Sequence, residues 1–366
     1  MKITDLKLYK LNVPLKKTFK TAVRSADTAE EVIVIIEGEA GVKGFGEAPS
    51  TAVITGDTSA SITALISGKI KDLLVGEEIE NLEKLHYLIE ASAVNNYSAK
   101  AAVEMAVYDL YARSYQIPLF RLLGGYSNQL YTDLTISVNS PQEMKKDALQ
   151  ALSEGYKSLK LKVGKNSQLD LKRIRTIREA VGPDVEIRLD ANQGWEAKEA
   201  VRVIRKLEAE NLGIEFVEQP VKAADIRGLK FVRENVLTPI MADESLFTAG
   251  DCIELLEMGA CDLLNIKLMK CGGIYNALKI NALAEAYGVE VMLGSMLEAK
   301  VSVTAAAHLA AAKKNISRVD LDAPGLLKKD PVQGGITFSG PEIMISENPG
   351  LDIKKVDDLI ELEKYK

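Results

Sequence analysis

Short apolar segments alternate with charged, amphipathic segments along residues 131–322, and this alternation constrains the fold more than any other feature of the chain. Eight of the apolar segments have the length and the residue types of buried strands. They are residues 131–138, 158–163, 185–190, 213–218, 239–243, 262–268, 289–294 and 317–322. Helical patterns separate these strands, which requires parallel pairing through crossover connections. The pattern therefore predicts an α/β fold built on a closed (β/α) barrel.

The regions on either side of this barrel have a different character. Residues 2–13 and 32–38 are predicted to be strands, and residues 44–50 the turn-rich end of a strand. A helical spacing of Ala, Leu and Ile runs from about residue 57 to 123. After residue 323 the pattern is one of loops and hairpins, which we expect to return to the first domain. The predicted division of the chain is into residues 1–125, 126–322 and 323–366.

Charge, hydropathy and cysteine content exclude several classes of protein. The net charge of −6 gives no support for nucleic-acid binding, and no apolar run is long enough for a membrane helix. The first 15 residues alternate like a strand and lack the apolar core of a signal peptide. Cys252, Cys261 and Cys271 form no CxxC pair and are expected to be buried free thiols. We expect a cytoplasmic protein that binds neither nucleic acid nor membrane.

Charged side chains stand at or near the ends of five successive predicted strands. They are Lys162, Asp190, Glu218, Asp243 and Lys267, and their spacing is regular. A single aspartate in such a place usually caps the next helix, and a single lysine in a strand is usually exposed. Five such residues in one register are better explained by a common site, because the carboxyl ends of barrel strands meet at one mouth.

The stretch SLKLKVG at 158–164 alternates strictly, so Lys160 and Lys162 share one face of the strand and the leucines share the other. In an antiparallel sheet the lysines would face water, whereas in a barrel they would face the interior. We predict Lys162 as a general base, with Lys160 as its electrostatic neighbour and a carboxylate contact. A dication and a second lysine nearby both disfavour the charged form of such a base.

Three carboxylates at this mouth predict a metal site. Asp190, Glu218 and Asp243 offer hard oxygen ligands without Cys or His, a set that suits Mg²⁺, with Mn²⁺ as a substitute. The metal would hold a substrate carboxylate and stabilise the enediolate that forms when the α-proton leaves. Lys267 lies four strands further round the barrel than Lys162, and therefore opposite it. Two bases on opposite faces of a planar enediolate predict racemisation or epimerisation.

Nearly the whole chain resembles the enolase superfamily. The motifs that carry the resemblance are, in order, GEAPS, AKAAVEMAVYDLYARSYQIPLFRLLGG, KLKVG, RLDANQGW, EFVEQP, MADES and NIKLMKCGGI. The resemblance implies a (β/α)₇β TIM-like barrel with an α+β capping domain, Mg²⁺ on the three carboxylates, and two lysine bases as in the muconate-lactonising subgroup. The subgroup similar to mandelate racemase needs a histidine at the seventh strand. His86 and His308 are the two histidines here, and both lie in helical segments.

An Asp-x-Asp pair at the eighth strand separates the members of this subgroup. Asp320 and Asp322 have the same strand parity, and two carboxylates at the mouth suit an ammonium group. Dipeptide epimerases carry such a pair to hold the amine of the dipeptide. The resemblance therefore implies an isomerase that inverts the α-carbon of the C-terminal residue of a dipeptide. The alternatives are an N-acylamino-acid racemase, an o-succinylbenzoate synthase, or a metal-stabilised binding protein, which the opposed lysines disfavour.

The side chains of the dipeptide would be recognised by two loops of the capping domain, at residues 19–26 and 51–57. Arg24 could pair with an acidic side chain, as in enzymes similar to Ala-Glu epimerases, whereas an apolar pocket could form from Phe19, Val23 and Ile54. The sequence leaves both readings open, as it does the formation of homo-oligomers. Four further residues are predicted at the mouth without a role, namely Ser137, Ser295, Met296 and Glu298.

Overall fold

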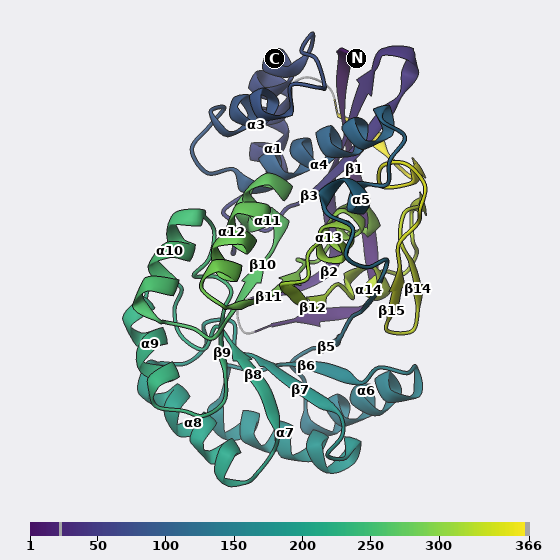
Figure 1. Ribbon diagram of the computed structural model, residues 1–366. Helices are drawn as coiled ribbons and strands as arrows, with labels where there is room; N and C mark the ends of the chain where they lie inside the picture. The colour runs from purple at the N-terminus through teal and green to yellow at the C-terminus, as the bar shows by residue number, and fades with distance from the viewer. Residues whose placement is uncertain (22–23, 363–366) are drawn as a thin grey trace.

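The barrel predicted from the sequence is present in the computed structural model, which describes residues 1–21 and 24–362 (Figure 1). Eight strands form one parallel sheet, and an isolated bridge between Thr132 and Val319 nearly closes it. In spatial order they are β5 (Leu134–Ile136), β6 (Ser158–Lys162), β7 (Glu186–Asp190), β8 (Ile214–Glu218), β9 (Ile240–Ala242), β10 (Leu263–Ile266), β11 (Glu290–Gly294) and β12 (Ile316–Asp320).

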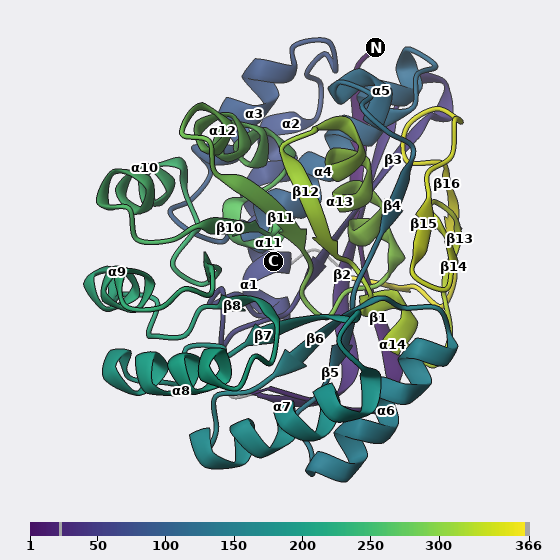
Figure 2. The ribbon, with the colours of Figure 1, turned by 60° about the horizontal axis from the view of Figure 1, so that its bottom comes forward.

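Helices cover the outside of this sheet, as Figure 2 shows for α7 to α10. They are α6 (Pro141–Ser153), α7 (Ser167–Val181), α8 (Ala197–Ala209), α9 (Ile226–Glu234), α10 (Ala249–Met258), α12 (Ile274–Ala286) and α13 (Lys300–Ala312). Two short helices, α11 (Leu268–Cys271) and α14 (Ala323–Leu326), instead follow the carboxyl ends of β10 and β12. Local sequence fixes several of their starts. Helix α6 begins with a capping box between Ser140 and Glu143, and α10 begins with one between Thr248 and Asp251.

The structure shows whether the alternating lysines of β6 face water or the barrel interior. Leu159 and Leu161 are fully buried in the main hydrophobic core, which lies between the strands and the helices. Lys160 and Lys162 are buried as well, but among the charged side chains of the barrel interior. The leucines therefore hold the strand against its helices, and the lysines serve the inside of the barrel.

The N-terminal part of the chain forms a capping domain of four strands and several helices, drawn above the barrel in Figure 1. Its strands are β1 (Ile3–Lys20), β2 (Ser25–Gly38) and β3 (Lys43–Pro49), with the late strand β17 (Ile360–Glu361) paired to β1. Its helical elements are η1 (Glu39–Gly41), α1 (Ser59–Leu65), η2 (Ile66–Ile70), α2 (Lys71–Leu74), α3 (Leu82–Glu90), α4 (Tyr97–Ser114) and α5 (Leu119–Leu123).

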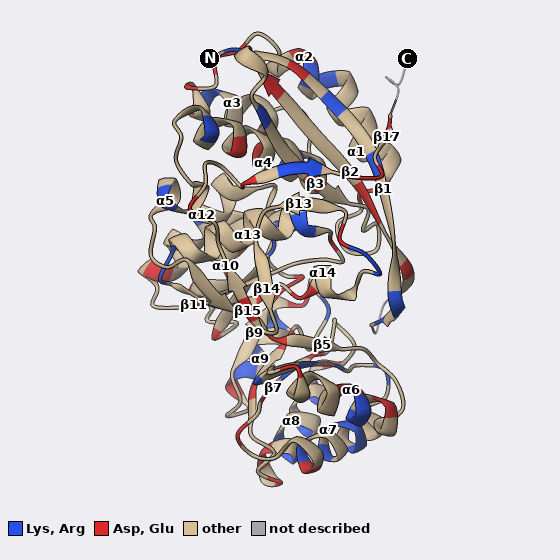
Figure 3. Ribbon diagram, turned by 90° about the vertical axis from the view of Figure 1, so that its right-hand side faces the viewer, with Lys and Arg blue, Asp and Glu red and all other residues tan. Residues whose placement is uncertain are grey.

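Small antiparallel sheets lie along the side of the molecule. They consist of β4 (Gln129–Tyr131) with β14 (Thr337–Ser339) and β15 (Glu342–Met344), and of β13 (Val332–Gly334) with β16 (Ile353–Val356). Both charge signs occur on the helices α6 to α8 in the view of Figure 3. No helix of the described residues is long and apolar enough to span a membrane. Cys252, Cys261 and Cys271 are buried and free.

Residues 44–50 are not the turn-rich strand end that the sequence suggested, because β3 is a regular strand paired along β2. Its glycines serve close packing instead. A Cβ atom at Gly44 would lie 2.0 Å from the carbonyl oxygen of Ala106, and one at Gly46 would lie 1.8 Å from that of Ala102. The two glycines thus allow α4 to lie directly on the strand.

Two buried carboxylates of the capping domain bind the first turns of barrel helices. Glu47 on β3 accepts hydrogen bonds from the backbone N–H groups of Ala299 (2.6 Å) and Ser302 (2.9 Å), at the start of α13. Glu104 on α4 accepts from the N–H of Tyr275 at 3.2–3.3 Å, at the start of α12. Both satisfy N–H groups that a helix leaves unpaired, at its positive end. They therefore join the two parts of the molecule.

Candidate active site

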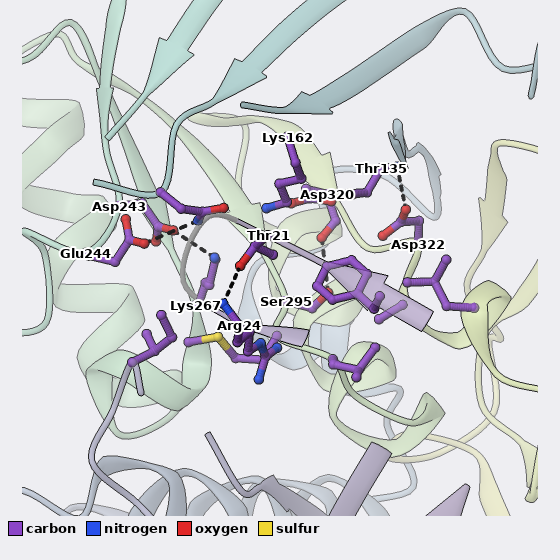
Figure 4. A pocket seen from close by; sticks show the side chains of 17 residues that line it. Thr21, Arg24, Thr135, Lys162, Asp243, Glu244, Lys267, Ser295, Asp320 and Asp322 are labelled. Carbon is purple, nitrogen blue, oxygen red and sulfur yellow. Dashed lines mark hydrogen bonds and ion pairs between the residues drawn. The ribbon is translucent and has the colours of Figure 1, made fainter. Parts of the chain in front are cut away.

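A cavity opens at the carboxyl ends of the barrel strands, beneath the capping domain, with about 560 Å³ of free space that includes its opening to solvent. We call it the mouth cavity, and its side chains are drawn in Figure 4. Its walls are formed by Phe19, Thr21, Arg24, Ile54, Thr135, Lys162, Asn192, Asp243, Glu244, Lys267, Ser295, Met296, Leu297, Asp320, Asp322, Ala323 and Leu326. It lies where active sites of (β/α) barrels are found.

The two predicted base lysines reach the mouth cavity from opposite sides. Lys162 is the last residue of β6, and Lys267 follows β10, which is four strands away in the ring of eight. Lys162 Nζ lies 2.5 Å from Asp190 Oδ2, and Lys267 Nζ lies 2.8 Å from Asp243 Oδ2. Each ammonium group is therefore held by a carboxylate and also faces the cavity.

The three predicted metal ligands stand on neighbouring strands and are buried. Asp190 and Glu218 are paired in the register of β7 and β8, and Asp243 follows β9. Burial and the neighbouring charge of Asp190 raise the pKa of Glu218 to about 8. The pKa of Asp190 is instead lowered, because the attraction of Lys162 and Lys160 exceeds the effect of burial. The three acids therefore lie close enough to influence one another's charge.

The donor set of these three residues fits a hard dication. Glu218 Oε2 and Asp243 Oδ1 are buried and accept no hydrogen bond from the described residues, although each faces a lysine Nζ at 2.6 Å. Within residues 1–21 and 24–362, no three acidic, histidine or cysteine side chains are already arranged around one metal position. The physical reason is that lysine ammonium groups lie between the carboxylates and balance their charge.

The same carboxylates change the protonation expected for Lys267. The sequence suggested that a nearby dication would favour the neutral form of the bases. Burial alone would lower the pKa of Lys267, but the carboxylates of Asp243, Glu218 and Asp190 together outweigh it and raise that pKa above its ordinary value. The acids therefore favour the charged form of this lysine.

Lys160 lies deeper than its predicted role as a carboxylate contact implied. It is fully buried and does not line the mouth cavity. Its Nζ contacts three carboxylates of the chain itself, at 2.6 Å from Glu218, 2.7 Å from Asp320 and 3.3 Å from Asp190. In the structure Lys160 lies one layer below Lys162, so it balances the charge of the acids from beneath.

Asp320 and Asp322 both line the mouth cavity, but in different settings. Asp320 ends β12 and is bound to Lys160, which lowers its pKa against the effect of burial. Asp322 lies beyond the strand, so strand parity does not determine its direction; it accepts a hydrogen bond from the N–H of Thr135 at 2.6 Å. Burial and the charge of Asp320 raise the pKa of Asp322 to about 7.

The side-chain recognition residues predicted on the capping loops also line the cavity. Arg24, Phe19 and Ile54 all belong to its walls, while Val23 lies outside the described residues. The guanidinium carbon of Arg24 lies 6.0 Å from the centre of the Phe19 ring. Burial lowers the pKa of Arg24, and in the described part of the chain no salt bridge involves this side chain.

Two residues predicted at the mouth lie elsewhere, while Ser295 and Met296 do line the cavity. Ser137 faces a neighbouring groove and accepts a hydrogen bond from the N–H of Lys20 at 3.4 Å, because β5 ends at Ile136 and its alternation stops there. Glu298 is buried behind the wall, where it accepts hydrogen bonds from Met296 N–H (2.5 Å) and Ser302 Oγ (2.6 Å).

Four residues of this region were given no role from the sequence. Glu244 and Asn192 line the cavity and are joined by a hydrogen bond of 3.3 Å. Lys270 is fully buried, with its Nζ 2.6 Å from Asp243 Oδ1, and Thr135 contacts Asp322. Glu244 and Asn192 lie within two residues of predicted metal ligands, in the motifs MADES and RLDANQGW, and that proximity was the available signal.

A (β/α) barrel with opposed lysines and a carboxylate trio at its mouth defines a class of enzymes that remove and return protons next to a carboxylate. Two family models match the chain: the mandelate racemase/muconate lactonizing enzyme N-terminal domain over residues 3–124, and the enolase C-terminal domain-like family over residues 143–358. The chain thus belongs to the mandelate racemase/muconate lactonizing enzyme family of the enolase superfamily.

Its similarity to individual members extends over the full length. An L-Ala-D/L-Glu epimerase from Clostridium acetobutylicum is 54% identical, over 98% of this chain and 100% of that protein. The substrate-liganded L-Ala-D/L-Glu epimerase from Bacillus subtilis has a TM-score of 0.97 at 52% identity, covering 97% of this chain and 99% of the other. The dipeptide epimerase from Enterococcus faecalis, complexed with Mg and L-Leu-L-Tyr, has a TM-score of 0.94 at 44% identity, covering 97% and 100%.

Proposed function

We propose that this protein is a dipeptide epimerase that inverts the α-carbon of the C-terminal residue. The observation that carries the proposal is that two lysines from opposite sides of the barrel share one cavity with an Asp-x-Asp pair. Relatives that are 44% to 54% identical over nearly the whole chain are dipeptide epimerases. An N-acylated amino acid has no α-ammonium group to place against Asp320 and Asp322.

The chain's own residues supply the proton transfers. Lys162 reaches one face of the substrate α-carbon and Lys267 the other, so one takes the proton and the other returns it. Asp190, Glu218 and Asp243 would hold Mg²⁺. When bound, that ion supplies positive charge beside the substrate carboxylate and makes the α-proton more acidic. Lys160 and Lys270 stay buried behind the acids and balance the remaining negative charge.

The dipeptide spans the cavity between two groups of charges. In Figure 4, Asp243, Glu244 and Lys267 lie toward one side and Asp322 and Thr135 toward the other. The substrate carboxylate belongs at the first group, and its ammonium group at Asp320 and Asp322. The abstracted proton is then on the C-terminal residue, because only its α-carbon adjoins the free carboxylate.

The division of the chain belongs to the same proposal. We assign residues 1–125 and 323–366 to the capping unit and residues 126–322 to the barrel, although β15 of the last segment pairs with β4. The pairing of β17 with β1 supports this assignment. Three free cysteines fit the reducing conditions of the cytoplasm, where we place the enzyme.

We further propose that the C-terminal residue of the dipeptide is acidic, as in Ala-Glu. Arg24 lines the cavity as a half-buried cation without a salt bridge among the described residues. The buried carboxylates of Glu31 and Glu298 attract it without reaching salt-bridge distance, and a substrate carboxylate would supply a direct partner. Phe19 and Ile54 then enclose the aliphatic part of that side chain. The 54% identical relative is an L-Ala-D/L-Glu epimerase.

Deuterium uptake from D₂O tests the function and the side-chain preference together. We expect Ala-Glu to gain one deuterium at the C-terminal α-carbon, detected by mass spectrometry, and to react faster than the neutral isostere Ala-Gln. Arg24→Leu should lower kcat/KM for Ala-Glu by about one to two decades, the value of a charge-assisted contact, and should barely affect Ala-Gln. Equal losses for both substrates would remove Arg24 from the recognition of the acid.

Removal of divalent cations should abolish turnover, and Mg²⁺ should restore it. Asp243→Asn should weaken Mg²⁺ binding by at least about tenfold in calorimetry, since loss of even an outer-shell contact has that effect. Asp184→Asn, an exposed change of the same kind, serves as the control. Full activity of exhaustively chelated protein would contradict the metal assignment.

The preference for a free amine should depend on pH. The pKa of Asp322 is raised to about 7, so its carboxylate is protonated below that pH and ionised above it. An ionised Asp322 attracts the substrate ammonium, whose own pKa is about 7.7–8.0. The ratio of kcat/KM for Ala-Glu to that for N-acetyl-Ala-Glu should therefore rise between pH 5.5 and 7.5.

Asp322→Asn should make this ratio smaller and abolish its rise between pH 5.5 and 7.5, because position 322 then carries no titrating carboxylate. The acetylated substrate is the internal control, since it carries no ammonium group. A wild-type preference for the N-acylated compound at every pH would favour an acylamino-acid racemase instead.

A further inference from the structure

The backbone that carries Lys267 continues directly into the interface between the barrel and the capping domain. Helix α11 starts immediately after this lysine, and two glycines, Gly272 and Gly273, join it to α12. Helix α11 lies against α4 of the capping domain (Figure 1). The segment that holds this lysine is therefore supported from both parts of the molecule.

The side chain of Glu104 on α4 binds the end of this segment. Its carboxylate accepts a hydrogen bond from the N–H of Tyr275 at 3.2–3.3 Å, and its Oε1 lies 2.8 Å from Nδ1 of His86. A Cβ atom at Gly273 would lie 1.8 Å from Glu104 Oε2, so the glycine gives the carboxylate room to reach the turn. Glu104 is buried and does not line the mouth cavity, so it acts on the turn and not on the substrate.

A second acid of the capping domain holds the same turn. Asn276 Nδ2 on α12 lies 3.3 Å from Glu90 Oε1 on α3, and it also donates to the backbone carbonyl of Cys271 at 2.9 Å. Cys271 is the last residue of α11. Glu90 and Glu104 thus bind α11 and the start of α12 together.

The backbone after Lys162 is held by barrel residues instead. The N–H of Val163 donates to the backbone carbonyl of Asp190 on β7 at 2.9 Å. The N–H of Gly164 donates to the carboxylate of Asp170 on α7, also at 2.9 Å. The two lysines therefore have different supports, although both face one cavity.

We propose that Glu104 is a positioning residue for Lys267 and not for Lys162, so that the capping domain affects proton transfer on one face of the substrate. The inference rests on the proposed dipeptide epimerase function. Without this carboxylate the N–H of Tyr275 loses its partner, and the turn that ends α11 can shift. Misplacing a reacting group by about 1 Å can lower a rate about 10²-fold.

Glu104→Ala tests the inference, because L-Ala-L-Glu and L-Ala-D-Glu can be followed separately in D₂O with Mg²⁺. Inversion needs both lysines, so epimerisation should fall in both directions. Exchange without inversion should fall by at least about tenfold only for the stereoisomer that no longer exchanges in Lys267→Ala. The other stereoisomer, which Lys162 serves, should exchange at the wild-type rate and so verify folding.

Two further variants separate positioning from a general loss of structure. Glu104→Gln keeps an oxygen for the N–H of Tyr275 and should retain exchange of both stereoisomers. Glu47→Ala removes the other capping-domain carboxylate that binds a barrel helix, at the start of α13. Since α13 carries neither lysine, this change should affect the two stereoisomers alike.

The thiol of Cys271 allows a measurement that needs no substrate. This thiol is buried in α11, and its Sγ lies 3.3 Å from the carbonyl oxygen of Gly273. In Glu104→Ala its alkylation by iodoacetamide should be at least about tenfold faster than in wild type, because opening of the turn no longer breaks a hydrogen bond to a carboxylate. Cys261, which is buried just before β10, should keep its rate.

The outcomes separate this inference from the function on which it rests. Loss of exchange for one stereoisomer, together with faster alkylation of Cys271, supports the positioning role. Equal loss for both stereoisomers, no loss, or unchanged alkylation of Cys271 would overturn that role and leave the epimerase intact. If wild-type protein takes up no deuterium from either stereoisomer, the epimerase function falls and the positioning role falls with it.

Discussion

Alanine at either Lys162 or Lys267 is expected to abolish epimerisation, while one-sided exchange of the α-proton with solvent persists. Each variant keeps one of the two bases that face the mouth cavity. Loss of a positioned general acid or base lowers a rate roughly 10²–10⁴-fold, and inversion needs both lysines. The remaining lysine can still remove a proton from one stereoisomer and return deuterium to the same face.

The measurement is deuterium uptake in D₂O for L-Ala-L-Glu and L-Ala-D-Glu separately, with chiral analysis of the product. We expect the two variants to exchange opposite stereoisomers, because their bases lie on opposite sides of the barrel. Lys165→Ala, an exposed lysine just after β6, is the matched control and should behave as wild type. Inversion at a near wild-type rate in either variant would refute the two-base mechanism.

The largest expected effect on stability comes from Lys160→Met. This lysine has no exposed surface and lies within 2.6–3.3 Å of three carboxylates. Breaking a buried ion pair by removing one partner costs about 3–5 kcal/mol, since the other charge is left uncompensated. We therefore expect a clear loss in the apparent Tm of metal-free protein.

Mg²⁺ should recover more of the Tm in Lys160→Met than it adds to wild type, because the dication replaces the missing positive charge among the acids. Thermal unfolding with chelator and with Mg²⁺ measures both values. Lys157→Met changes an exposed lysine at the start of the same region and should leave the Tm unaltered. An unchanged Tm in metal-free Lys160→Met would show that Lys160 does not hold the acids together.

The sequence predicted the barrel because its strands are short apolar runs between amphipathic helices. This pattern can be recognised without knowledge of tertiary contacts. It also placed Lys162 and Lys267 at opposite sides, since both positions follow from strand order alone. The direction of side chains that follow the strand ends was harder to predict. Ser137 and Glu298 lie where loops turn, and a loop side chain points where its hydrogen-bond partners lie, as Glu298 does toward Ser302.

The sequence also could not predict how deep each lysine lies inside the barrel. Alternation puts Lys160 and Lys162 on the same face, but only the packed structure shows that one lines the mouth cavity and the other lies below it. The role of Lys270 was missed because a lysine after a strand gives no sign that its ammonium group will reach an acid on the neighbouring strand end. Such contacts depend on the curvature of the closed sheet.

The carboxylates that join the capping domain to the barrel bear on how such a protein can evolve. The residues proposed to read the substrate's acidic group, above all Arg24, come from the first 60 positions, whereas the proton-transferring lysines come from the barrel. A genetic crossover near residue 125 would therefore exchange substrate choice and keep the chemistry. It would yield a folded chimaera only where Glu47 and Glu104 still meet the first turns of α13 and α12. These two glutamates thus set which capping domains are interchangeable.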